Sequence, residues 1–333
     1  MDIGIDLGTA NVMISMGNKG VVLNEPSVVA FNKRLNEVIA VGDEAYRMVG
    51  RTPEHITVVR PLSDGVISDH KMTKMMIMAF IEKVTGKQLF MPNIVMCVPS
   101  SVTDVESRAV IEAAKSAGAR QVYLIDEPVA AIMGAGVDIS RPDGNMVVDI
   151  GGGTTDIAVV SLNGVVTKSS VKMAGNKLDK AIVRYVSNRY RILIGEKMAE
   201  NAKIAAANIY SPDGSRKIVV KGRHLVRGLP EQIELSDYDI YEAIIDNINE
   251  MINAVKNVFE KTPPELVGDI YQNGIYLTGG GALLYGLDKL MSSQIGVPCH
   301  IADDPLSCVA KGTRFAFKNL GKLLDGFEQV SMI

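Results

Sequence analysis

The segment Ile3-Gly-Ile-Asp-Leu-Gly-Thr-Ala-Asn11 joins a short apolar strand to a turn of small residues. A similar segment, Met146-Val-Val-Asp-Ile-Gly-Gly-Gly-Thr-Thr-Asp156, occurs later in the chain. Asp6 and Asp149 take matching places in these segments, and each segment is followed by another apolar strand, a turn and a third strand. A repeat with so long a period indicates a duplicated domain rather than a solenoid. The sequence therefore predicts two α/β halves that begin with the same three-stranded meander.

Strands and a helix alternate between the two segments. Asn93 to Val98 and Gln121 to Ile125 are short apolar runs typical of buried strands, and Thr103 to Ala117 between them has apolar residues at helical spacing after a capping residue. This order favours a right-handed crossover within a parallel part of the sheet. The Met-rich segment Met72 to Val84 is apolar nearly all round, which predicts a helix buried in the core. We expect a mixed sheet with helices in each half.

Composition excludes several classes of protein. The chain has 333 residues, of which 47% are hydrophobic and 22% charged, so it is neither disordered nor fibrous. The net charge of −3 and the lack of a basic run argue against a nucleic acid partner. The three cysteines have no disulfide or zinc spacing, and the first residues do not form a secretory signal. We expect a cytoplasmic protein.

The glycine-rich turns of the repeat indicate phosphate binding. Such turns expose consecutive backbone N–H groups where a side chain would block close approach. A triphosphate has enough oxygens for two turns that face each other. The carboxylates of Asp6 and Asp149 would repel phosphate unless Mg²⁺ lies between them, bound largely through its waters. The alternative is that both carboxylates cap their turns, but the repetition favours the metal.

A third glycine cluster, Thr278-Gly-Gly-Gly-Ala-Leu-Leu-Tyr-Gly286, follows an apolar strand that begins at Ile275. Backbone without side chains lets a flat base lie against it, so we interpret this cluster as a wall for adenine. The alternative is an ordinary turn between a strand and a helix. Together the three clusters predict a site for ATP or ADP with Mg²⁺.

In order and spacing, the three clusters resemble the ATPase superfamily of actin, heat-shock-70 proteins and sugar kinases. Other segments resemble one of its families more specifically, the MreB family of bacterial actin homologues, and the resemblance covers about residues 2 to 320. These segments are Leu23-Asn-Glu-Pro-Ser-Val-Val29, Val49-Gly-Arg-Thr-Pro53, Arg60-Pro-Leu-Ser-Asp-Gly-Val66, Asp126-Glu-Pro-Val-Ala-Ala131 and Leu193-Ile-Gly-Glu196.

The resemblance implies a fold of duplicated, ribonuclease-H-like (actin-like) α/β halves around a nucleotide cleft, each half with a smaller inserted subdomain. It also implies an ATPase that polymerises with itself into filaments of paired protofilaments. These would lie at the inner face of the cytoplasmic membrane, where they would direct cell shape through the machinery of elongation or wall synthesis. The implied parts are a first core (1–31, 71–140 and 311–333) with insertion 32–70, and a second core (141–180 and 241–310) with insertion 181–240.

The same resemblance implies roles for single residues. Glu127 would orient the attacking water with help from Thr154, and Asp6 and Asp149 would hold the magnesium shell. From its position alone, at a strand end before Pro128, Glu127 could equally be a helix-capping carboxylate. The residues that would bind the nucleotide are Gly8, Thr9, Ala10, Asn11, Gly151, Gly152, Gly153, Thr155, Glu200, Lys203, Gly279, Gly280, Gly281, Ala282 and Leu283.

The sequence departs from the family pattern in the adenosine region. MreB-like chains have Glu-x-x-Lys-x-Glu on one helix face, whereas this chain has Glu200-Asn-Ala-Lys-Ile-Ala205. Losing one charged hydrogen bond to a ribose hydroxyl costs about 1 to 3 kcal/mol, so we expect looser nucleotide binding. The alternative is an ordinary solvated helix face with Glu200 and Lys203 as an ion pair.

Membrane contact is expected at Leu89 and Phe90, in a short loop where MreB-like proteins insert into the bilayer, although both side chains could instead pack in a core. Two other functions use the same scaffold. A sugar-type small-molecule kinase would need a polar acceptor pocket, and the family-specific segments argue against it. A chaperone would need a peptide-binding domain, for which we expect no room.

Overall fold

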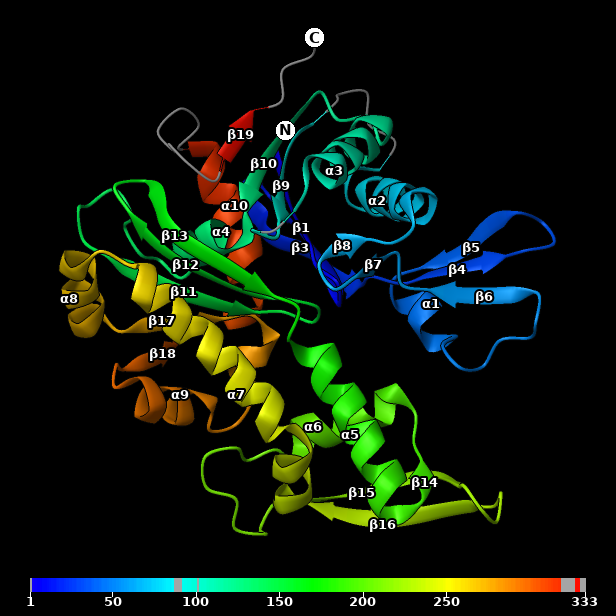
Figure 1. The fold of residues 1–333 in the computed structure, drawn as a ribbon. Helices are drawn as coiled ribbons and strands as arrows, with labels where there is room; N and C mark the ends of the chain where they lie inside the picture. The colour runs from blue at the N-terminus through cyan, green and yellow to red at the C-terminus, as the bar shows by residue number, and fades with distance from the viewer. Residues whose placement is uncertain (1, 87–91, 101, 319–326, 330–333) are drawn as a thin grey trace.

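The computed structural model describes residues 2–86, 92–100, 102–318 and 327–329. Two mixed sheets form the cores of the two halves (Figure 1). In the first sheet the strand order is β19-β10-β9-β1-β2-β3. The β1–β2–β3 meander is antiparallel, β9 and β10 add to it in parallel, and β19 is antiparallel to β10. The strands are β1 (Asp2–Leu7), β2 (Asn11–Met16), β3 (Gly20–Pro26), β9 (Asn93–Val98), β10 (Gln121–Asp126) and β19 (Phe327–Gln329).

The second sheet repeats this plan in the order β13-β12-β11-β17-β18. Again the meander is antiparallel and the added strands are parallel. Asp6 and Asp149 are each the penultimate residue of the first strand of their meander. The predicted duplication is therefore confirmed. The strands are β11 (Asn145–Ile150), β12 (Thr155–Ser161), β13 (Gly164–Val171), β17 (Ile275–Thr278) and β18 (Cys299–Ile301).

Helices cover the outer faces of both sheets and fill the space between them. Residues of α2 and α3 share a core with β1, β2 and β9, whereas α4 and α10 share a core with both sheets and stand between them (Figure 1). On the far side of the second sheet lie α7 and α9. Within the described residues, no helix is both long and apolar enough to span a bilayer. These helices are α2 (His70–Thr85), α3 (Asp104–Ser116), α4 (Glu127–Gly134), α7 (Asp237–Lys261), α8 (Pro264–Asn273), α9 (Leu287–Ile295) and α10 (Cys308–Lys318).

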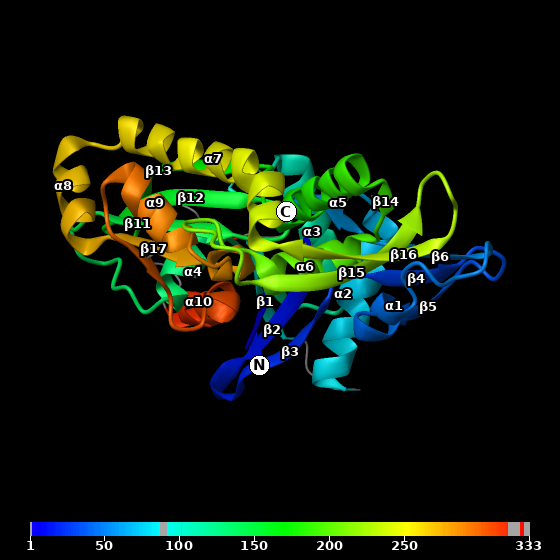
Figure 2. The ribbon, with the colours of Figure 1, turned by 90° about the horizontal axis from the view of Figure 1, so that it is seen from below.

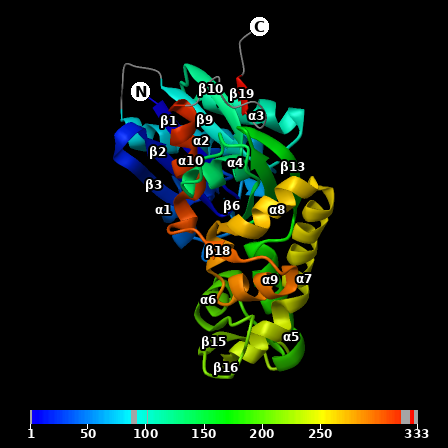
Figure 3. The same ribbon diagram turned by 90° about the vertical axis from the view of Figure 1, so that its left-hand side faces the viewer.

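A small subdomain extends from each half. The first small subdomain is α1 (Asp43–Arg47) with the sheet of β4 (Val29–Asn32), β5 (Glu37–Val41) and β6 (Ile56–Val59). The second small subdomain, which projects at one end of the molecule (Figure 3), consists of α5 (Gly175–Tyr190), α6 (Glu196–Ala206), β14 (Ile192–Leu193), β15 (Lys217–His224) and β16 (Pro230–Ser236). The domain boundaries given above stay predictions. The remaining short elements are β7 (Leu62–Ser63), β8 (Val66–Ile67), η1 (Gly17–Lys19), η2 (Gly280–Leu283) and η3 (Pro305–Ser307).

Local sequence signals agree with most of these elements. The helix expected from Thr103 to Ala117 is α3, whose N-terminus is closed by a reciprocal capping box between Thr103 and Glu106.

The Met-rich segment Met72 to Val84 was predicted to be a helix buried in the core, and this prediction was wrong for one face of the helix. Met76 of α2 is fully buried, but Met78 is 40% exposed. An apolar composition did not reveal that only one face of α2 packs against the first sheet.

The two central helices touch through their backbones. A Cβ added at Gly134 of α4 would lie 1.8 Å from the carbonyl oxygen of Cys308, and one added at Gly312 of α10 would lie 1.8 Å from that of Ala130. The contact is reciprocal, because on each helix the two residues are one turn apart. Only glycine permits so close an approach. This crossing therefore fixes the distance between the halves.

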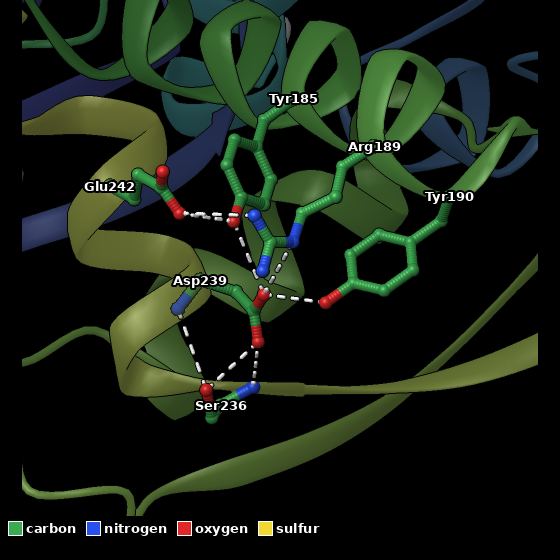
Figure 4. A network of polar contacts seen from close by, with 6 residues as sticks. All are labelled: Tyr185, Arg189, Tyr190, Ser236, Asp239 and Glu242. Atoms are coloured by element: carbon green, nitrogen blue, oxygen red, sulfur yellow. Dashed lines mark hydrogen bonds and ion pairs between the residues drawn. The ribbon is translucent and has the colours of Figure 1, made fainter.

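A polar network joins the end of α5, in the second small subdomain, to the start of α7 (Figure 4). The Tyr190 hydroxyl donates to Asp239 and the Tyr185 hydroxyl to Glu242, both at 2.6 Å. Asp239 also forms a capping box with Ser236. Burial alone would raise the pKa of Asp239, but hydrogen bonds from Tyr190 and Ser236 outweigh it and hold that pKa below its ordinary value. The network stabilises this subdomain at neutral pH, and its contribution is lost as the pH falls through the lowered pKa.

Gly312→Ala tests the helix crossing. The added methyl would overlap the Ala130 carbonyl, so we expect a loss of about 1 to 3 kcal/mol and a lower melting temperature. Gly268→Ala in α8 is the control, because a Cβ there meets nothing within 4 Å. It should be neutral or stabilise by up to about 1 kcal/mol. Equal melting temperatures for the two variants would argue against the crossing as a constraint.

Candidate functional site

A cavity of about 380 Å³ lies between the halves, and most of the predicted site residues line it. Thr155 and Ala282 do not, because both are fully buried behind the wall. Leu89 and Phe90 lie outside the described residues. The predicted residues in the wall are Asp6, Gly8, Thr9, Ala10, Asn11, Glu127, Asp149, Gly151, Gly152, Gly153, Thr154, Glu200, Lys203, Gly279, Gly280, Gly281 and Leu283.

The glycine turns of the two halves lie against each other. A Cβ added at Gly152 would be 2.7 Å from the Cβ of Ala10, and one added at Gly153 would be 2.5 Å from Thr9 Oγ1. A side chain at either glycine would therefore push the two turns apart. Both turns also line the same cavity, so one bound group could meet the backbone of both, as phosphate binding requires.

Asp149 is buried and Asp6 half-buried in the wall of this cavity. Burial, and then the Asp149 carboxylate, raise the pKa of Asp6 to about 8. Burial also raises the pKa of Asp149 to about 7, although the Thr278 hydroxyl donates a hydrogen bond to it at 2.7 Å. Without a cation, both groups therefore tend to hold protons near neutral pH. A divalent cation could take the place of these protons.

The donor set fits magnesium held in part by other ligands. Among the residues that the structure describes, no three side chains of His, Cys, Asp and Glu converge as a metal site. Mg²⁺ keeps several waters and is commonly bound by one or two carboxylates together with substrate phosphates. Asp6 and Asp149 beside two glycine turns match that requirement.

Glu127 is the first residue of α4 and follows directly on β10. Its side chain is 8% exposed and lines the cavity. Burial, and then Asp156 and Asp6, raise the pKa of Glu127 well above its ordinary value. Without a cation in the cavity Glu127 therefore favours its protonated form, and only its ionised form could accept a proton from water. Its place in the cavity wall favours the water-orienting role over the helix-capping alternative.

A third loop borders the phosphate side, and sequence analysis missed its part in the site. The Gly65 N–H, in the turn between β7 and β8, donates to Thr9 Oγ1 at 3.1 Å. Gly65 has a φ of +78°, and a Cβ there would lie 2.6 Å from the Thr154 methyl. The signal was present in the Asp-Gly dipeptide of the segment that begins at Arg60, which predicts a tight turn.

Lys203 is held by a residue that sequence analysis also missed. Its ammonium lies 2.8 Å from Asp179, and the two side chains are only 14% and 10% exposed. It also donates to the Gly175 carbonyl at 3.3 Å. Burial raises the pKa of Asp179, and the nearby Lys203 opposes that rise. The available signal was an acidic residue on the buried face of α5.

The base side of the cavity is apolar. Gly279, with a φ of +77°, packs so tightly on β11 that an added Cβ would lie 2.4 Å from the Ile150 carbonyl oxygen. Beyond it, Leu283, Tyr285 and Ile204 line the cavity although each is more than half exposed. Exposed apolar side chains around a hollow suit a flat ligand such as a base. Sequence analysis placed Tyr285 within the cluster interpreted as a wall for adenine, but it assigned no contact to Tyr285 itself or to Ile204.

Ala205, the residue at which the sequence departs from the family pattern, is exposed on α6. Its carbonyl oxygen accepts a hydrogen bond of 3.2 Å from Arg216, whose guanidinium lies 4.5 Å from the Tyr285 ring centroid. This end of α6 is thus fixed to the apolar side of the cavity without a carboxylate at position 205.

Comparisons with known proteins agree on one family. The family model described as "MreB/Mbl protein" matches residues 1–325. The cell shape-determining protein Mbl of Bacillus subtilis (strain 168) is 50% identical over 323 residues, 97% of each chain. The cell shape-determining protein MreB of Escherichia coli (strain K12) is 47% identical over 317 residues, 93% of this chain and 91% of that protein. MreB 5 of Spiroplasma citri bound to AMPPNP is similar in structure, with a TM-score of 0.89 at 38% identity over 96% of both chains.

Asp6→Asn tests the buried charge. The pKa of Asp6, about 8, lies above its ordinary 3.8, so without cation or nucleotide the stability of the folded protein falls as the pH rises between these values. Removing the carboxylate should therefore raise the melting temperature at pH 8 by at least about 2 °C, the equivalent of roughly 1 kcal/mol. The difference should shrink at pH 5.

The control is Asp246→Asn, at an exposed position on α7. It should leave the melting temperature unchanged at both pH values. A lower melting temperature for Asp6→Asn than for the unmodified protein at pH 8 would show that Asp6 is compensated within the protein itself.

Proposed function

This chain belongs to the MreB/Mbl family, and on that premise we propose that it is an actin-like cytoskeletal protein that binds and hydrolyses ATP with Mg²⁺. It assembles into filaments that direct cell shape and elongation. The proposal rests above all on one observation, the two duplicated glycine turns that lie against each other beside Asp6 and Asp149. The curated relatives are named as cell shape-determining proteins, which supports this function and not the small-molecule kinase.

The proposed chemistry is phosphoryl transfer to water by positioning. Backbone N–H groups of the turns at Thr9–Asn11 and Gly152–Thr154 hold the phosphates from both sides. When bound at Asp6 and Asp149, Mg²⁺ would offset the negative charge of the phosphates. Glu127 orients the attacking water and accepts its proton, and Thr154 helps to align that water. Support for a nucleotide also comes from the solved structures of Spiroplasma citri MreB 5 with AMPPNP and with ADP.

Assembly follows from the way the cavity is built. Its wall comes from both halves and from α6 of the second small subdomain, and the hairpin of β7 and β8 adds Gly65. One nucleotide therefore contacts parts that can move relative to each other about the crossing of α4 and α10. We infer that bound ATP fixes the subdomain arrangement that polymerises and that hydrolysis releases it.

Membrane association belongs to the same proposal. Leu89 and Phe90 would insert between lipid headgroups, each contributing about 1.5 to 3 kcal/mol on burial. One subunit would attach weakly, whereas a filament repeats the contact many times. Attachment would then depend on polymerisation and bring the filament to the elongation machinery.

Glu127→Ala tests the catalytic assignment. Because it removes water alignment and leaves the phosphate turns intact, we expect phosphate release to slow by about 10²-fold or more while ATP binding persists. Glu112→Ala, at an exposed position on α3, should hydrolyse ATP normally. Unchanged phosphate release in Glu127→Ala would refute the assignment.

Sedimentation tests polymerisation. ATP and Mg²⁺ should make the unmodified protein pellet, whereas a small-molecule kinase would stay in solution and would need an acceptor to consume ATP.

The membrane contact predicts the behaviour of a double variant. Leu89→Ser with Phe90→Ser should abolish co-flotation of ATP-assembled filaments with vesicles that contain phosphatidylglycerol. Leu35→Ser with Val226→Ser is the matched control, since both side chains are exposed elsewhere on the molecule. The control should still float. Continued flotation of the Leu89 and Phe90 variant would remove the membrane claim.

A further inference from the structure

One contact joins the two small subdomains next to the cavity. The hydroxyl of Tyr46, on α1 of the first small subdomain, donates to Glu200 Oε2 on α6 of the second at 3.2 Å. On the same helix, Lys197 Nζ lies 4.5 Å from the centroid of the Tyr46 ring. The helix α1 belongs to the subdomain of the sheet β5-β4-β6, and α6 belongs to the subdomain of the separate sheet β14-β15-β16. Figure 2 shows both subdomains from below. Tyr46 thus bridges them through two kinds of interaction with α6.

Tyr46 contacts the cavity wall through one of its residues, Glu200. Glu200 lines the cavity, half-buried, and the hydrogen bond uses only its Oε2. Its Oε1 is left as a second acceptor, which a ribose hydroxyl could fill. The position of this carboxylate therefore matters directly to any nucleotide in the cavity.

In this chain Glu200 has little help from its neighbours on α6. Lys203, one turn away, is bound to Asp179 and to the Gly175 carbonyl. Ala205 supplies no side-chain acceptor at all. A ribose on this side of the cavity depends mainly on Glu200, and the orientation of Glu200 depends on Tyr46.

The hydroxyl is suited to this task. Burial, and then the Glu200 carboxylate, raise the pKa of Tyr46, while Arg60 acts in the opposite direction. The hydroxyl therefore keeps its proton at neutral pH and remains a donor to Glu200. The Lys197 ammonium over the ring limits the side-chain orientations that are open to Tyr46.

We propose that Tyr46 is a positioning residue of the nucleotide site. Its hydroxyl holds the Glu200 carboxylate in place for a ribose hydroxyl. In this way Tyr46 offsets the missing carboxylate at position 205. The inference rests on the proposed function, since it takes the ligand to be ATP.

The test measures release of radiolabelled ATP, in the presence of Mg²⁺, into an excess of unlabelled ATP. Tyr46→Phe keeps the ring and removes only the hydroxyl, and we expect it to release ATP roughly tenfold faster, the effect of one hydrogen bond to a charged group. Tyr271→Phe makes the same change on α8, where the tyrosine is 65% exposed and outside the cavity wall, and should release ATP at the unmodified rate.

A ribose analogue separates positioning from a structural effect. Labelled 2′,3′-dideoxy-ATP has no ribose hydroxyl that could donate a hydrogen bond to Glu200, so the unmodified protein and Tyr46→Phe should release it at the same rate. Equal acceleration with ATP and the dideoxy analogue, or no acceleration with either, would overturn the role of Tyr46. An unmodified protein that retains no ATP would instead refute the proposed function, and this role with it.

Discussion

The carboxylates of Asp6 and Asp149 are buried toward the same cavity, and burial raises the pKa of both. Each is the penultimate residue of the first strand of a duplicated meander, so the duplication itself brings two like charges together. Two buried acids in this position destabilise the unliganded protein unless they hold protons or a cation. In the proposed function, Mg²⁺ bound together with a polyphosphate would relieve that cost, because the cation would supply the missing positive charge. The stability of the site and the binding of its ligand would then be linked through electrostatics.

This arrangement depends on how closely the halves approach. The backbone contact between α4 and α10, made possible by Gly134 and Gly312, sets the separation of the two sheets. The same helix α4 begins with Glu127, so the element that joins the halves also carries the proposed water-orienting group. Any movement about this crossing would shift Glu127 relative to the turns of both halves. In the proposed mechanism, this short helix would couple hydrolysis to conformation.

Local patterns were enough to predict the meanders, α3 and the glycine turns, because each depends on residues close in sequence. The site residues that were missed depend on distant contacts. Gly65 reaches the cavity only because its hairpin folds onto Thr9, and Asp179 only because α5 packs beside α6. Nothing in the sequence distinguishes Tyr285 and Ile204 from other exposed apolar residues. Only their position beside the cavity identifies them as site residues. The hydrophobic periodicity of a single sequence does not predict such contacts between subdomains.

Hydrogen–deuterium exchange of the backbone amides tests most directly whether one nucleotide is held between both halves. Addition of ATP with Mg²⁺ should slow exchange at residues 9–11 and 152–154 together, over the same range of ATP concentration. Protection of only one turn, or of both turns with different midpoints, would contradict the account.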